Sequence, residues 1–99
     1  MSHALVAVYD HPRETWSQQQ RFLHERIIPM VKSQPGFISG TWSYEKNESK
    51  SYSYVVFASE ADARKMETFM RDEAARPNPF GVALGSITVV DVIAEARAG

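Results

Sequence analysis

Apolar and polar positions along this chain follow two periodicities, one typical of strands and one typical of helices. The apolar, partly β-branched run Ala4–Tyr9 predicts a strand that is covered on both faces. A stripe at spacings of three and four residues then predicts a helix that ends at about Lys32 and begins after Asp10 or Thr15, either of which can cap it. The stripe comprises Trp16, Gln20, Leu23, Ile27, Met30 and Val31. Pro29 lies inside this helix and should kink its last turn, because proline removes a backbone hydrogen bond.

A hairpin follows the first helix. Pro35-Gly36 predicts a turn, and the charged segment Glu45–Lys50 separates two runs with strand periodicity, Phe37–Tyr44 and Ser51–Ala58. Uninterrupted alternation sorts their side chains into two faces. One face carries Phe37, Ser39, Thr41, Ser43, Ser53, Val55 and Phe57. The other carries Ile38, Gly40, Trp42, Tyr44, Tyr52, Tyr54 and Val56, so that Trp42 should lie near Tyr54 and Tyr44 near Tyr52.

The last two predicted elements are a helix over Glu60–Arg76, with Ser59 as its cap, and a strand over Ser86–Ala94. The order is therefore β-α-β-β-α-β, which predicts an α+β, ferredoxin-like domain over residues 1–99. Right-handed crossovers place both helices on one face of a four-stranded antiparallel sheet. The other face exposes Trp42, Tyr44, Tyr52 and Tyr54, and a homodimer that packs sheet against sheet would cover them.

Composition narrows the possible partners. The net charge of −1 gives no electrostatic footprint for nucleic acid, and no apolar run is long enough to cross a membrane. The chain has no cysteine, so disulfides and thiolate metal sites are excluded. Asp10 and His11 are adjacent, but no third ligand is indicated, so no metal site is expected. With no basic segment at the N-terminus to suggest a signal peptide, we expect a cytoplasmic protein.

The sequence resembles the dimeric α/β-barrel superfamily and, within it, the antibiotic biosynthesis monooxygenase group. The element order, Pro29, Pro35-Gly36-Phe37 and the junction Val55–Ala63 carry the resemblance. It implies a homodimer with a pocket in each subunit between sheet and helices. Members include cofactor-free quinol oxygenases, haem-degrading enzymes, isomerases and many proteins of unknown role, so the fold does not fix the function.

Several positions depart from the active members of that group. Oxygenases and haem degraders usually carry Trp where Phe57 stands, and the quinol oxygenases have Asn and Tyr where Ser53 and Ala63 stand. Haem degraders take a histidine ligand from the second helix, and Glu60–Arg76 contains no histidine. Their strand-1 asparagine is also absent from Ala4–Tyr9. The known quinol-oxygenase constellation is therefore not transferred, and no cofactor is expected.

The resemblance also orients the hairpin, because it directs the serine-threonine face toward the helices. The candidate substrate-binding residues are Tyr9, Ser39, Thr41, Ser43, Ser53 and Phe57. Alternatively, the hydroxyl groups are solvated at the end of the sheet. His24 flanks the first helix's stripe and is the candidate general base, because imidazole titrates near neutrality; the alternative is an exposed helix histidine. Trp42, Tyr44, Tyr52 and Tyr54 are the candidate dimer interface.

These features favour a cofactor-independent monooxygenase-like protein that acts on a small aromatic or polyketide-like molecule. In that chemistry the substrate supplies the electrons to O₂, and the protein excludes water, holds the substrate and removes a proton. The alternative is a dimer that binds a small molecule without catalysis, or an isomerase on the same scaffold, since the usual Trp, Asn and Tyr positions are missing.

Overall fold

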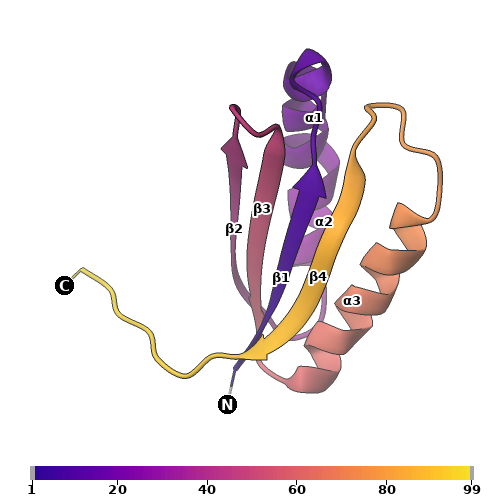
Figure 1. The fold of residues 1–99 in the computed structure, drawn as a ribbon. Coiled ribbons are helices and arrows are strands. Elements are labelled where there is room, and N and C mark those ends of the chain that lie inside the picture. Colours follow the sequence, from indigo (N-terminus) through magenta and orange to yellow (C-terminus); the bar gives the residue numbers. More distant parts are fainter. Residues whose placement is uncertain (1, 99) are drawn as a thin grey trace.

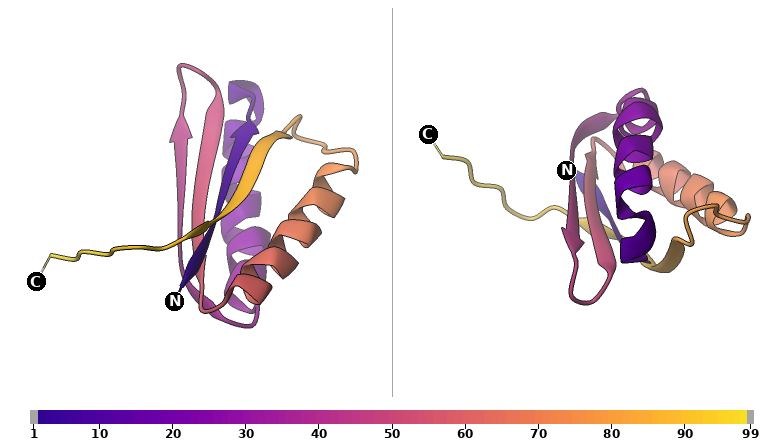
Figure 2. Two further views of the ribbon diagram at one scale, coloured as in Figure 1. Left: turned by 60° about the horizontal axis from the view of Figure 1, so that its bottom comes forward. Right: turned by 90° about the horizontal axis from the view of Figure 1, so that it is seen from above.

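The computed structural model describes residues 2–98 and has the predicted element order. The strands are β1 (His3–Asp10), β2 (Phe37–Glu45), β3 (Lys50–Phe57) and β4 (Ala83–Asp91). They form one antiparallel sheet in the order β2-β3-β1-β4 (Figure 1). Both helical segments lie on the same side of this sheet (Figure 2). The predicted α+β, ferredoxin-like architecture is therefore confirmed.

The central strand β1 separates the two faces of the sheet. Its residues Leu5 and Ala7 point toward the helices, are at most 1% exposed and belong to the main core cluster. Val6 and Val8 point the other way, where they lie between Tyr54 and Tyr52 of β3 and Thr88 and Ser86 of β4. The sequence correctly predicts an apolar central strand, and its helix-facing side chains anchor the core.

The first helical segment is interrupted. A turn of 3-10 helix, η1 (Arg13–Thr15), leads into α1 (Trp16–Phe22), a π-helical turn η2 (Leu23–Ile27) and α2 (Ile28–Lys32). In the π turn the Ile28 N–H donates to the Leu23 carbonyl, five residues back. Pro29 accounts for the wider turn, because its ring would clash with the carbonyl four residues earlier in a regular α-helix. Pro29 therefore perturbs the turn before it.

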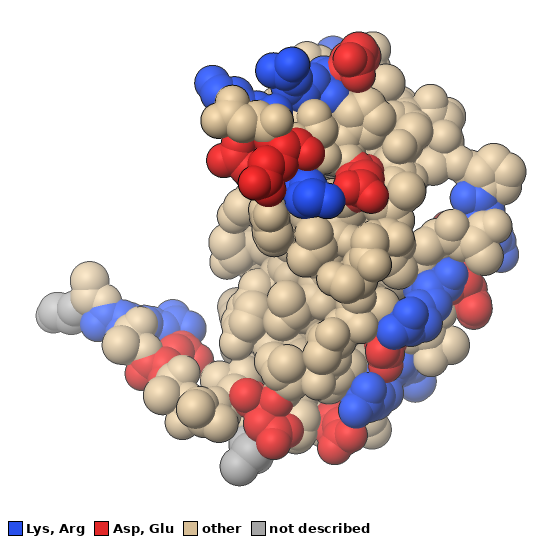
Figure 3. Space-filling model, viewed as in Figure 1, with Lys and Arg blue, Asp and Glu red and all other residues tan. Residues whose placement is uncertain are grey.

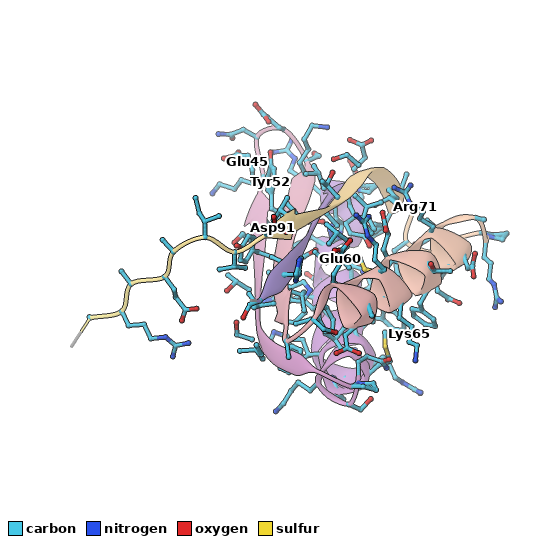
Figure 4. The ribbon with its side chains drawn as sticks, turned by 90° about the horizontal axis from the view of Figure 1, so that it is seen from below. Glu45, Tyr52, Glu60, Lys65, Arg71 and Asp91 are labelled. Carbon is cyan, nitrogen blue, oxygen red and sulfur yellow. The ribbon has the colours of Figure 1, made fainter. Side chains whose placement is uncertain are left out.

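The second helical segment, α3 (Glu60–Ala74), is regular and begins at the predicted cap. The Asp62 N–H donates to Ser59 Oγ at 3.2 Å, and Ser59 Oγ donates to the Asp62 carboxylate at 2.8 Å. By contrast, neither Asp10 nor Thr15 caps the first segment with its side chain. Lys65 on the outer side of α3 points away from the sheet (Figure 4).

Strand β4 starts and ends three residues earlier than the sequence predicts. Val8 pairs with Ser86 but Tyr9 pairs with Leu84, so Gly85 is the extra residue of a bulge. Pairing resumes beyond the bulge and includes Ala83, which the prediction had left in the connection. Residues 92–98 have no regular structure and leave the sheet on the side opposite to the helices (Figure 2, right).

The sheet face turned away from the helices is open and largely free of charge (Figure 3). Tyr52, Tyr54 and Ile38 are each 41–47% exposed, and Val6, Val8 and Val90 are partly exposed. Charged side chains gather instead at the β2–β3 hairpin and along α3 (Figure 3). Among the described residues, no helix is long and apolar enough to span a membrane.

Candidate functional site

A cavity of about 1180 Å³ lies between the sheet and the two helical segments. This volume is slightly above the range of about 300–1,000 Å³ that is typical of ligand pockets. Its apolar wall comes from both helical segments and from the sheet. That wall includes Ile27, Met30, Trp42, Val55, Met66 and Met70. The cavity therefore has the size and the lining of a site for a small, largely apolar molecule.

The segment between α3 and β4 covers one end of this cavity. Phe80 packs against Phe22 of α1, with their ring centroids 5.8 Å apart. Thr15 Oγ1 donates to the Phe80 carbonyl at 2.6 Å, so the side chain expected to cap a helix holds this segment instead. An opening remains visible beside the α3–β4 connection (Figure 3).

Three rings from separate parts of the chain form the wall near the β2–β3 hairpin. Trp16 of α1 stacks on Tyr44 of β2, with centroids 4.1 Å apart and the planes inclined by 9°. His11, which follows β1, lies edge-on to both rings at 5.2 Å. The Tyr44 hydroxyl donates to the His11 carbonyl at 3.1 Å, and the His11 N–H donates to the Ser49 carbonyl at 2.7 Å. The hairpin therefore fixes the position of His11.

The imidazole of His11 is buried without a hydrogen-bond partner. His11 is 3% exposed, and neither its Nδ1 nor its Nε2 has a partner among the described residues. Gln19 Oε1, also in the cavity lining, is buried and unpaired in the same way. Burial lowers the pKa of His11, because a charged imidazolium loses its hydration there. His11 is therefore a neutral imidazole at neutral pH, with its hydrogen-bonding capacity unused.

Tyr9 and Ser53 are the predicted binding residues that the structure places well inside the cavity lining. Burial raises the pKa of Tyr9 to about 12, so its phenol stays protonated at neutral pH. Ser53 is 6% exposed and faces the helices opposite Ala7. Both can offer a hydroxyl group to a molecule in the cavity. Ser43 borders the hairpin end of the cavity and is exposed, but it pairs with the outward-facing Tyr52, so the prediction that it faces the helices is wrong.

His24 lies in the π turn and lines the cavity, but its side chain is exposed. π-Helical turns occur frequently at functional sites. The two histidines of the lining therefore differ in burial: His24 is in contact with solvent, and His11 is enclosed by aromatic rings.

The predicted side-chain faces of β2 are wrong beyond Phe37. Phe37 pairs with Phe57, but Ser39 pairs with Val56, so the strand contains one extra residue. Such a bulge reverses the alternation of every later side chain. Ser39 and Thr41 therefore lie on the sheet face away from the helices and do not line the cavity.

The same bulge moves two predicted interface residues into the cavity. Trp42 pairs with Ser53 and Tyr44 with Ser51, instead of lying near Tyr54 and Tyr52. Trp42 packs on the core, and its indole extends over Gly40, where a Cβ would fall 2.6 Å from the ring. Tyr52 and Tyr54 remain on the outer face, as predicted, although Tyr52 also borders the cavity near the hairpin.

Phe57, a predicted substrate-binding residue, is also placed elsewhere. It is fully buried in the core, lies edge-on to Phe37 at 6.4 Å and does not line the cavity. Phe57 does not reach the cavity because it ends β3 at the end of the sheet away from the hairpin. The cavity occupies only the hairpin-side part of the space between sheet and helices.

The donor groups of the cavity do not suit a metal ion or a haem held by α3. No group of three His, Cys, Asp or Glu side chains within residues 2–98 is placed to hold a metal ion. Helix α3 presents Met66, Phe69 and Met70 to the cavity, and it contains no histidine. Neither His11, whose ring nitrogens are buried, nor His24, which is exposed, takes the place of a histidine ligand on α3. The cavity residues therefore do not fit haem bound through α3.

No protein-family model matches the sequence, and no curated protein matches it closely. Solved structures, however, share its fold. A protein of Shewanella loihica PV-4, provisionally described as a monooxygenase, has a TM-score of 0.68 and 18% identity, over 95% of this chain and 96% of the other. The haem degrader MhuD of Mycobacterium tuberculosis, with two haems bound in its active site, has a TM-score of 0.64 and 18% identity, over 98% of this chain and 100% of the other. A mutant of MhuD with two manganese protoporphyrin IX bound per active site has a TM-score of 0.62 and 17% identity, over 99% of this chain and 100% of the other.

These likenesses confirm the resemblance to the antibiotic biosynthesis monooxygenase-like group at the level of the fold. The chain is an α+β protein of the ferredoxin-like class to which these structures belong. At this identity the likeness concerns the fold alone, and function must come from the site.

Proposed function

We propose that the cavity binds a small aromatic or polyketide-like molecule and that the protein promotes its oxidation by O₂ without a cofactor. The proposal is carried by the partly open cavity between sheet and helices, whose wall is apolar and aromatic and includes a few hydroxyl and imidazole groups. Such a site holds a planar molecule, excludes much of the water and can accept a proton. The fold shared with a protein provisionally described as a monooxygenase supports the same reading.

The chemistry needs only groups that the substrate and the cavity supply. A naphthohydroquinone provides four electrons to O₂; one oxygen atom becomes a new ring hydroxyl, and the other leaves as water. The product is a hydroxynaphthoquinone, so atoms and electrons balance without a metal or flavin. The protein has to orient the ring and take a hydroxyl proton, because the anion transfers electrons more readily. The sequence predicts His24 as the group that performs this proton transfer, and the cavity lining also holds a second imidazole, that of His11.

The open sheet face favours a homodimer. Tyr52, Tyr54 and Ile38 are large, exposed side chains that share one face of the sheet. A second copy packed sheet to sheet would cover them. Residues 92–98 extend on that same side, and Ile93 is 92% exposed (Figure 2). Light scattering at micromolar concentration should give twice the monomer mass; a stable monomer would overturn this part of the proposal. A cytoplasmic location stays a prediction from the sequence.

Oxygen uptake with 1,4-dihydroxynaphthalene tests the oxidation. We expect consumption above the rate of autoxidation and formation of 2-hydroxy-1,4-naphthoquinone. A slower reaction in His24→Ala would assign the proton transfer to His24, as the sequence predicts, and an unchanged rate would assign it to another group of the cavity. Lys65→Ala, on the outer side of α3, should leave the rate unchanged. Formation of 1,4-naphthoquinone and hydrogen peroxide alone would mean that no oxygen atom is inserted, and would contradict a monooxygenase.

One observation favours a second candidate, a dimer that binds a small molecule without catalysis. Phe57 stands where active relatives usually carry a tryptophan, and it is sealed in the core rather than facing the cavity. Tight binding of dihydroxynaphthalene or its quinone, with no oxygen uptake above autoxidation, would identify this binding function. Conversion of a bound substrate into an isomer, without oxygen uptake, would instead indicate an isomerase.

A further inference from the structure

We propose that His11, rather than His24, accepts the ligand's hydroxyl proton, and that the Trp16 indole occupies the place that an aromatic ligand takes against Tyr44. This inference rests on the proposed function, because it assigns the proton-accepting group and the stacking surface of the same cavity. It assigns His11 a catalytic role and Trp16 the role of a displaceable wall.

The first observation is the unused imidazole. His11 is 3% exposed, and both ring nitrogens are buried and unpaired among the described residues. Buried polar groups are nearly always hydrogen-bonded, so an imidazole kept without a partner needs an explanation. A ligand hydroxyl that reaches it would provide one. His24, exposed at the cavity lining, is free to interact with water instead.

The second observation is how unequally the three rings are held. The His11 backbone is fixed through Ser49, and Tyr44 is tied to His11 by its hydroxyl group. No hydrogen bond holds the Trp16 side chain among the described residues, and its contacts with the cluster are the 4.1 Å stack and the edge contact with His11. Trp16 is also the first residue of α1, a helix whose start has no side-chain cap. Trp16 is therefore the ring that can leave.

The third observation is the geometry of the stack. Trp16 lies nearly parallel to Tyr44, inclined by only 9°, and His11 lies at the edge of this pair. A planar ligand that replaces the indole can stack on the same Tyr44 face. Its edge then lies beside His11, where a ring hydroxyl would meet the imidazole. The displaced indole would also give up its edge contact with His11.

The proton transfer is simple to balance. The ligand O–H bond breaks, the proton bonds to the imidazole nitrogen that holds the lone pair, and a phenolate remains. Asp10, the nearest carboxylate along the chain, is already paired with Lys50 at 2.8 Å. The phenolate is thus the counter-ion of the imidazolium.

Binding of 2-hydroxyanthraquinone tests both parts, because this planar phenol absorbs at longer wavelength when ionised. At a pH where the free dye is neutral, the wild-type protein should bind it as the phenolate. The ¹⁵N signals of the His11 ring should move from neutral to protonated values when the dye is added. His11→Gln should abolish the phenolate band and weaken binding about tenfold. His24→Gln tests whether the other histidine takes the proton, and it should keep the band and the affinity if His11 is the acceptor. Lys65→Gln, on the outer side of α3, is the control and should change neither.

The two tryptophans of the cavity provide the control for displacement. Trp16→Ala should tighten dye binding about three- to tenfold, because the ligand no longer has to displace the indole. Trp42→Ala removes a wall that stays in place and should weaken binding. Equal weakening in both variants would overturn the displacement.

The remaining outcomes separate the inference from the proposed function. If the wild type binds the dye as the phenolate, and His11→Gln retains the band or the His11 ¹⁵N signals do not move, the role of His11 is wrong and the cavity function stands. Loss of the band in His24→Gln alone would assign the proton to His24. If the wild-type protein does not bind the dye at all, the proposed function and this inference both fail.

Discussion

The two ends of the layer between sheet and helices are built differently. At the end where β3 finishes, Phe57 and Leu5 are fully enclosed, and Ala63 and Met66 of α3 pack on them at no more than 3% exposure. At the hairpin end the helical segments leave a cavity, and the buried His11 lacks partners. The comparison indicates that one end is built for stability and that the other leaves room for the proposed ligand site.

The local structure of the helices explains this division. α3 starts from a satisfied cap at the packed end and is held along its outer side by ion pairs between Arg64 or Arg71 and Glu67. The first segment lacks a side-chain cap near the cavity and widens into a π turn over it. Regular structure therefore accompanies the dense core, and irregular structure accompanies the site.

The largest expected effect breaks the packed end. Phe57→Ala should lower the free energy of unfolding by about 3–5 kcal/mol, because it removes a large, fully buried ring. Phe22→Ala at the other end is the control and should cost clearly less, since Phe22 is 41% exposed. Urea unfolding of both variants measures the difference. Equal losses would show that the two ends contribute alike.

A smaller effect should appear at alkaline pH at the cavity end. The folded pKa of Tyr9 is raised to about 12 from 10.0, so the unfolded chain loses this proton first. The contribution of the protonated Tyr9 phenol to stability is complete below pH 10 and should fall by about 2–3 kcal/mol as the pH rises through 12. Tyr9→Phe should remove this part of the alkaline loss. Unfolding measured at pH 8 and pH 11.5 compares the two proteins, and identical alkaline losses would contradict the burial of Tyr9.

Removing the cap of α3 should have a more modest effect. Ser59→Ala takes away the acceptor of the Asp62 N–H and should destabilise the protein by about 1 kcal/mol. Ser17→Ala, an exposed position in α1, is the matched control and should be close to neutral. Thermal unfolding can resolve the two. A neutral Ser59→Ala would mean that the packed end does not depend on its cap.

The smallest effect concerns the hairpin contact at the cavity end. Tyr44→Phe removes the hydrogen bond to the His11 carbonyl but keeps the ring, so we expect a loss of about 0.5–1.5 kcal/mol. Tyr54→Phe, on the outer face and exposed, is the control. Chemical unfolding gives the stability of each variant. A greater loss from Tyr54→Phe would show that the outer face is more constrained than the cavity wall.

The fold was predictable because its signals are local. Helical and strand periodicities, the Pro35-Gly36 turn and the Ser59 cap each depend on neighbouring residues, and together they give the element order. The positive φ of 77° at Gly36 also agrees with a turn glycine. Tyr9 and Ser53 could be placed on the helix side because β1 and β3 alternate without interruption in this region.

The cavity wall was not predictable by the same reasoning. The bulge at the start of β2 has no local sequence signal, and one extra residue exchanges Trp42 and Tyr44 with Ser39 and Thr41. The burial of His11 had no sequence signal, because its partners Tyr44 and Ser49 lie far along the chain. The Gly-x-Trp pattern at Gly40 and Trp42 is the one feature that could have indicated an indole lying along the strand.

The π turn has a further consequence for how such a cavity can diversify. Each residue of an α-helix advances the side-chain direction by about 100°, so one additional residue rotates everything after it. In η2 the widening absorbs that rotation locally, between the cavity end and Val31, which is buried in the core. The directions of the side chains on α1 are therefore set independently of those on α2. Changes of length at this turn can re-aim the α1 residues over the cavity while α2, anchored in the core through Val31, keeps its place.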